Sequence, residues 1–108
     1  MTEHIKEIDA FDRAYCERVR EALWKAVVDV SRDPATGVAV LRNYEVYDAL
    51  LQLQAMILAS SKEAQSPRRA RETSEEFAKR LRQLVARYRR KYEAVGLPFE
   101  VVHTDELQ

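Results

Sequence analysis

Residues that break helices or cross-link chains are scarce in this sequence. There are two glycines, three prolines and one cysteine among 108 residues. So few turn-forming residues argue against an all-β fold and against a disordered chain. The single Cys16 cannot form an intramolecular disulfide, and the acidic start of the chain does not resemble a secretory signal. These absences favour an all-α protein in a reducing, cytoplasmic compartment.

Motifs that carry catalysis or bind cofactors are also missing. Gly37 and Gly96 are isolated, so neither belongs to a glycine-rich phosphate loop. The sequence holds no HExxH, no paired cysteines and no G-x-S-x-G, and His4 and His103 lie at opposite ends of the chain. We therefore predict no catalytic residue, no cofactor and no metal ligand, and a protein that is not an enzyme.

Net charge and long apolar runs are absent as well. Eighteen Lys/Arg balance 18 Asp/Glu, and the longest stretch without an ionisable acid or base is the 13 residues from Ala49 to Ser61. A membrane-spanning helix needs about 20 apolar residues. The sequence therefore predicts no membrane partner.

What the sequence does contain is helical periodicity in three segments. From about residue 3 to 30, apolar residues recur every three or four positions, which predicts a long amphipathic helix. The apolar stripe consists of Ile8, Phe11, Tyr15, Val19, Leu23, Ala26, Val27 and Val30. The following SRDPATG contains Pro34 and Gly37 and predicts a turn, after which Val38–Leu41 is compatible with an extended segment.

The second segment, about 43–62, is the most apolar part of the chain. Its apolar side chains cover roughly 220° of an ideal helix surface, so a single packing partner would leave much of it exposed. We predict a buried central helix with Asn43 as its N-cap.

The third segment, about 67–95, has a narrower apolar stripe of about 120°. Ser66 with Pro67 favours a start near 67, while Thr73 with Glu76 would give a start near 74. Gly96 and Pro98 end this helix. The partly extended tail, 96–108, is predicted to pack over Trp24 and Val28 or to pair with Val38–Leu41.

Short connections between three helices predict antiparallel neighbours. The expected fold is one all-α domain, residues 1–108, built as an elongated three-helix antiparallel (up-down-up) bundle with a short, partly extended C-terminal tail.

The prediction of function depends on two residues outside the stripe of the first helix and three on the wide arc of the second. Trp24 and Val28 project away from the first helix's stripe, and Leu51, Gln54 and Leu58 lie on the wide arc of the second helix. Apolar surface beyond what three helices cover tends to become an interface. These five residues predict a non-enzymatic protein–protein interaction protein, an adaptor or structural protein, that forms a homodimer or binds another protein.

A basic stretch offers the alternative. Residues 68–91 hold 10 Lys/Arg against 3 Asp/Glu, and such positive density can attract nucleic acid. The cations concerned are Arg80, Arg82, Arg87, Arg89, Arg90 and Lys91. A structural role is also possible, because cations near a helix C-terminus favour its dipole and Glu75–Lys79, Glu76–Arg80 and Arg89–Glu93 have the spacing of ion pairs.

A third reading is an enzyme with a site between helices. Its best candidates are Glu45, Asp48 and Gln54, because Glu45 and Asp48 share one helical face and Gln54 lies inside the apolar arc. This reading requires these polar groups to converge in a cavity.

Overall fold

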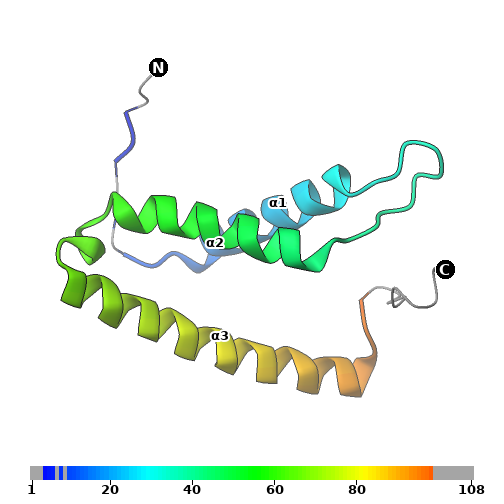
Figure 1. Cartoon of the computed structure of the whole chain (residues 1–108). Helices are drawn as coiled ribbons and strands as arrows, with labels where there is room; N and C mark the ends of the chain where they lie inside the picture. Colours follow the sequence, from blue (N-terminus) through cyan, green and yellow to red (C-terminus); the bar gives the residue numbers. More distant parts are fainter. Residues whose placement is uncertain (1–3, 7, 9, 99–108) are drawn as a thin grey trace. The chain divides into compact units, whose positions relative to one another are not determined.

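The computed structural model describes residues 4–6, 8 and 10–98. Within them the protein is all-α, with three α-helices, one short 3₁₀ helix and no strand. The elements are α1 (Arg13–Val30), α2 (Asn43–Ala59), η1 (Lys62–Ala64) and α3 (Pro67–Val95) (Figure 1). The chain divides into two compact units, Met1–Lys62 and Glu63–Gln108. Each unit is described by itself.

Helix α1 begins at Arg13 rather than near residue 3. Asp12 has an extended backbone, and its Oδ1 atom accepts a hydrogen bond from the Tyr15 backbone N–H at 3.1 Å. An aspartate that captures this amide stabilises a helix start at its own position. The apolar Ile5, Ile8 and Phe11 precede the helix and are exposed.

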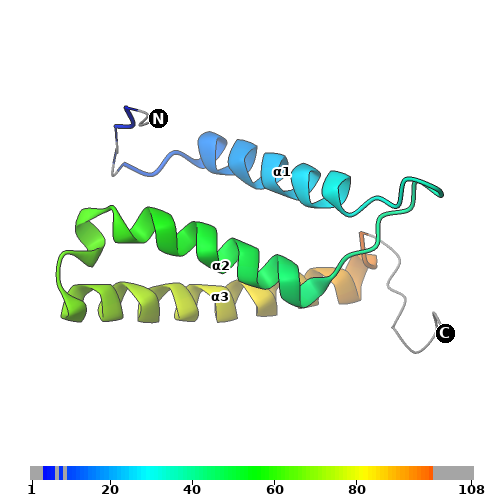
Figure 2. The ribbon, with the colours of Figure 1, turned by 45° about the horizontal axis from the view of Figure 1, so that its top comes forward.

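A structured turn, residues 31–42, joins α1 to α2 (Figure 2). Gly37 has a φ of 74°, as a glycine turn permits, and its N–H donates to the Asp33 carbonyl at 2.8 Å. Asp33 Oδ1 also accepts from the Ala35 N–H at 2.8 Å. The predicted extended segment pairs back on the chain through a single antiparallel bridge between Arg32 and Ala39.

Helix α2 differs from its prediction at its start. Asn43 is its first helical residue, and Arg42 occupies the N-cap position without a side-chain hydrogen bond to the helix. No residue of α2 is buried in the structure, so the predicted burial of α2 as a central helix is not shown. At its other end, the Ser60 hydroxyl donates to the Ile57 carbonyl at 2.9 Å.

Helix α3 begins at the earlier of the two starts considered. Ser66 Oγ accepts from the Arg69 N–H at 3.1 Å, and Pro67 occupies the first turn. At the other end Gly96 has a φ of 88° and donates its N–H to the Tyr92 carbonyl at 2.8 Å. Residues 99–108 of the predicted tail lie outside the described residues, as do its predicted contacts.

The most informative feature of the fold is the lack of a core. Among the described residues none is buried, although 46% of the chain is hydrophobic. A two-helix hairpin or a single amphipathic helix has only one packed side, so neither unit alone can enclose its apolar residues. Packing of the three helices into the predicted bundle is not shown.

Candidate functional surfaces

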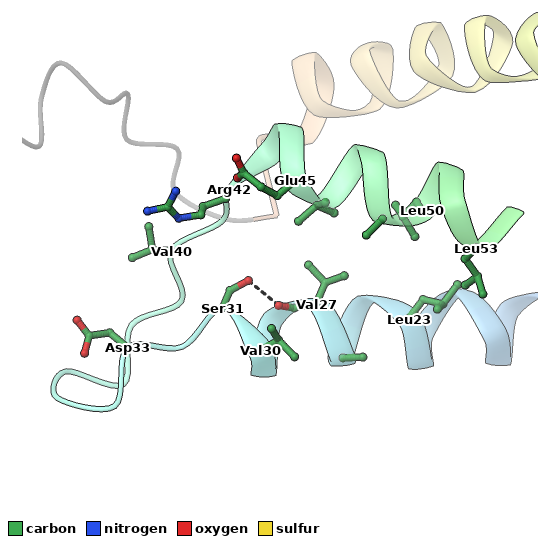
Figure 3. A pocket seen from close by; sticks show the side chains of 13 residues that line it. Leu23, Val27, Val30, Ser31, Asp33, Val40, Arg42, Glu45, Leu50 and Leu53 are labelled. Atoms are coloured by element: carbon green, nitrogen blue, oxygen red, sulfur yellow. Dashed lines mark hydrogen bonds between the residues drawn. The ribbon is translucent and has the colours of Figure 1, made fainter. Parts of the chain in front are cut away.

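An apolar groove runs between α1 and α2 in the first unit. The two helices lie side by side and antiparallel, and Leu23 and Val27 of α1 point toward Leu50 and Leu53 of α2 (Figures 2 and 3). The groove has a volume of about 680 Å³. Its lining residues are Leu23, Ala26, Val27, Val30, Ser31, Asp33, Val40, Arg42, Glu45, Val46, Ala49, Leu50 and Leu53.

The polar residues of the groove gather where the turn meets the helices. Asp33, Arg42 and Glu45 line this end, with Ser31 donating its hydroxyl hydrogen to the Val27 carbonyl at 2.6 Å (Figure 3). Two carboxylates against one guanidinium make this end acidic. The groove therefore fits an apolar partner that carries positive charge near one end.

The groove is open rather than enclosed. Leu50 is 42% exposed, Leu53 is 41% exposed and Val30, at the end of α1, is 87% exposed. Only Leu23, Val27, Ser31 and Val46 of its lining are half-buried. Contiguous exposed apolar surface of this kind is typical of contact surfaces.

The five residues predicted as a protein interface lie outside this groove. Trp24 and Leu51 are exposed, at 47% and 62%, and Gln54 is exposed too. Val28 and Leu58 are half-buried. None of the five lines the groove, so they form a second set of positions, four apolar and one polar, apart from it. Their role as an interface stays a prediction.

The polar residues considered for catalysis do not converge. Glu45 lines the groove, whereas Asp48 accepts a hydrogen bond from the Gln52 side chain and, like Gln54, is not part of the lining. Across the described residues, no group of three or more His, Cys, Asp or Glu could hold a metal ion. His4 and Cys16 are exposed, and His103 lies outside the described part of the chain.

The basic residues of α3 lie on a fully formed helix. Arg80, Arg82, Arg87, Arg89, Arg90 and Lys91 are all exposed. Within the described part of the chain none of these six forms an ion pair. The pairs expected at Glu75–Lys79, Glu76–Arg80 and Arg89–Glu93 are not formed, while Arg68 pairs with Glu72 at 3.0 Å. The positive charge in the second half of α3 is therefore not neutralised within the helix.

Two tyrosines accompany these cations. Tyr88 and Tyr92 are half-buried, and their ring centroids lie 5.9 Å apart with the rings tilted by 37°. They sit on the apolar side of α3, as the helical spacing predicts.

Sequence reasoning identified the apolar residues of the groove but missed its polar end. Asp33 and Arg42 come from a turn that was assigned no role. The D-P-A-T-G spacing was the available signal for Asp33, because an Asx turn with a following glycine holds the Asp33 side chain against the Ala35 N–H. No such signal was available for Arg42.

Comparison with known proteins finds no matching family model, no similar curated protein and no similar solved structure. The class that the geometry defines is an all-α protein with three α-helices in its described residues. No helix in that part of the chain is long and apolar enough to cross a membrane.

Proposed function

We propose that this is a non-enzymatic, cytoplasmic helical protein, an adaptor or structural component, that acts through protein contacts and associates with itself as a homodimer. One observation carries the proposal. The described residues include 21 exposed large hydrophobic side chains on all three α-helices and their connections, and no buried one. Burial of apolar surface is the main driving force of folding, so these surfaces need partners.

In the proposed bundle, part of this apolar surface is buried by contacts within one chain. The apolar stripe of α3 packs antiparallel into the groove between α1 and α2, which gives the up-down-up bundle. Charge supports this pairing, because the groove has an acidic end formed by Asp33 and Glu45 and α3 carries cations beside its stripe.

The remaining apolar surface forms the contact between copies. The residues concerned lie outside the lining of the groove: Trp24 and Val28 on α1, and Leu51, Gln54 and Leu58 on α2. Of these, Trp24, Leu51 and Gln54 are exposed, and Val28 and Leu58 are half-buried. Tryptophan is among the residues that most often carry the binding energy of an interface, and less energetic neighbours around it exclude water.

Sedimentation velocity at tens of micromolar protein tests this function. The expected mass is twice that of the 12.6 kDa chain. The double variant Trp24→Ala/Leu51→Ala should dissociate at concentrations where Val38→Ala, an exposed apolar truncation in the turn, stays dimeric. A wild-type protein that remains monomeric over the whole range would contradict the proposal.

A second function rests on the six unpaired cations of α3. They provide the positive density with which a protein attracts nucleic acid phosphates. Titration with labelled DNA and RNA at two salt concentrations tests it, since phosphate contacts make affinity fall steeply with salt. Absence of binding at low salt would exclude it.

A further inference from the structure

The charges of α3 are sorted around its axis. With residues about 100° apart, Arg80, Arg87 and Lys91 lie along one edge of the apolar stripe, and Arg82 and Arg89 lie along the other. The acids lie away from the stripe, at Glu72, Glu75, Glu76 and Glu93. Cations therefore border the apolar stripe on both sides in the second half of the helix.

The stripe between these cations is accessible. Leu81 is 62% exposed and Val85 is 49% exposed, and Val95 near the end of the helix is exposed as well. Tyr88 and Tyr92 lie on the same stripe. This surface offers apolar side chains, tyrosine hydroxyls and unpaired cations together.

The bundle proposed above would leave part of this stripe free, and the inference rests on that proposal in this one respect. Helix α3 has 29 residues and α2 has 17. At 1.5 Å per residue, α3 is longer by about 18 Å. If α3 folds back antiparallel along α2, its C-terminal residues extend past the start of α2. These residues include Tyr88, Tyr92 and most of the unpaired cations.

We propose that the C-terminal half of α3 binds the surface of membranes that contain anionic lipids, lying in the plane of the headgroups rather than crossing the bilayer. Amphipathic helices with cations on the polar face and a narrow apolar stripe bind in this way. Lysine and arginine stems extend along the apolar surface while their charges reach the phosphates, and tyrosines favour the headgroup level.

Binding to an anionic membrane accounts for both the apolar and the basic side chains of α3, whereas binding to nucleic acid accounts only for the basic ones. Nucleic acid phosphates would neutralise the cations but would leave Val85 and Val95 in water. An anionic bilayer supplies negative charge and an apolar layer at once, which matches a stripe bordered by arginines.

Co-sedimentation with vesicles tests the proposal. The protein should bind phosphatidylcholine vesicles that contain phosphatidylserine, and should not bind vesicles of phosphatidylcholine alone. Inorganic phosphate should displace it no better than chloride at the same ionic strength. Stronger displacement by phosphate would show a simple anion site and overturn the proposal.

Matched charge variants locate the bound face. Each arginine at the bilayer surface contributes about fivefold to binding, so Arg87→Gln/Arg89→Gln should weaken partition by roughly 25-fold. Lys79→Gln/Arg90→Gln removes the same charge from the face opposite the stripe and should weaken it much less, because the helix diameter of about 10 Å is close to the Debye length. Equal losses would overturn the assignment of this face.

The apolar stripe needs its own variant. Val85→Ser/Val95→Ser, which lie beyond the part of α3 that matches α2 in length, should abolish vesicle binding while leaving any binding to DNA at low salt unchanged. Vesicle binding that survives this change, or binding to DNA without binding to vesicles, would refute the proposal. Circular dichroism of each variant checks that α3 is still helical.

A fluorescence measurement avoids dependence on destabilising variants. In Trp24→Phe/Tyr92→Trp the only tryptophan lies on the stripe. Its emission should shift to shorter wavelength with anionic vesicles, and lipids that carry a quencher should reduce it. An unchanged emission would contradict the proposal. Self-association is measured without vesicles, so either proposal can fail without the other.

Discussion

The Glu63 carboxylate accepts a hydrogen bond from the Arg69 guanidinium at 3.0 Å, joining the 3₁₀ turn η1 to the first turns of α3. The Thr73 hydroxyl also donates to the Glu63 carbonyl, at 3.4 Å. The turn before α3 is therefore held by side chains from two successive turns of that helix. The start of α3 is therefore stabilised by the Ser66 cap and by the contacts of Arg69 and Thr73 with Glu63, which precedes the helix.

The cap at Ser66 should matter more than this ion pair. Ser66→Ala removes the acceptor of the Arg69 N–H and should cost about 1 kcal/mol of stability. Glu63→Gln should cost less, about 0.5 kcal/mol or below, because both partners of the pair are partly exposed to water. Thermal unfolding followed by circular dichroism at one protein concentration measures both. Ser66→Asp should retain the cap, and a larger loss for Glu63→Gln than for Ser66→Ala would contradict this order.

Gly96 should resist replacement for reasons of backbone conformation alone. Its φ of 88° is unfavourable for any residue with a Cβ atom, yet no heavy atom lies within 4 Å of where that Cβ would be. Gly96→Ala should therefore destabilise the protein by about 1–3 kcal/mol, and Gly96→Asn by a similar amount, because the ψ of 166° lies outside the left-handed region that asparagine tolerates. Urea unfolding measures the difference. Equal stability of Gly96→Ala and wild type would show that the end of α3 refolds into another conformation.

Local signals in the sequence were enough to place both ends of α3, but not the start of α1. Ser66, Pro67 and Gly96 mark the ends of α3 because capping and positive φ are properties of a few neighbouring residues. The start of α1 was placed too early because periodicity from Ile8 onward extends past Asp12, which caps the helix instead. Periodicity reports which side chains share a face but not where the backbone hydrogen bonds begin.

The apolar stripes of the candidate surfaces could be read from spacing, but their burial could not. The helical spacing places Leu23, Leu50 and Leu53 on apolar helix faces that we expected to be buried. In the structure these three residues line an open groove. Burial depends on which element or copy covers a stripe, and charge or spacing within one helix does not define that partner. The acidic end of the groove depends on a turn that places Asp33 and Glu45, 12 positions apart, in the lining of one groove.

Trp24 should report self-association directly. It is the only tryptophan of the chain and is 47% exposed in the single chain. Burial at a contact between copies moves indole into a less polar environment, so its emission maximum should shift to shorter wavelength as protein concentration rises. Trp24→Ala should weaken dimer formation by more than tenfold, as expected for an aromatic anchor. An emission maximum that stays constant while sedimentation shows a dimer would place the interface elsewhere.

The cost of truncating Leu53 should show whether the groove is filled. Leu53 lines the open groove between α1 and α2, and its side chain is 41% exposed. If α3 packs into the groove, Leu53→Ala removes a core side chain and should cost about 2–5 kcal/mol. If the groove stays open, the same change should lie within about 0.5 kcal/mol of neutral, as for surface substitutions. Met56→Ala, on the same helix, outside the groove and 70% exposed, is the matched control. Urea unfolding at one protein concentration compares the two variants, and because we propose a filled groove, we expect the larger loss for Leu53→Ala alone. Equal small losses would show that α3 does not occupy the groove in solution.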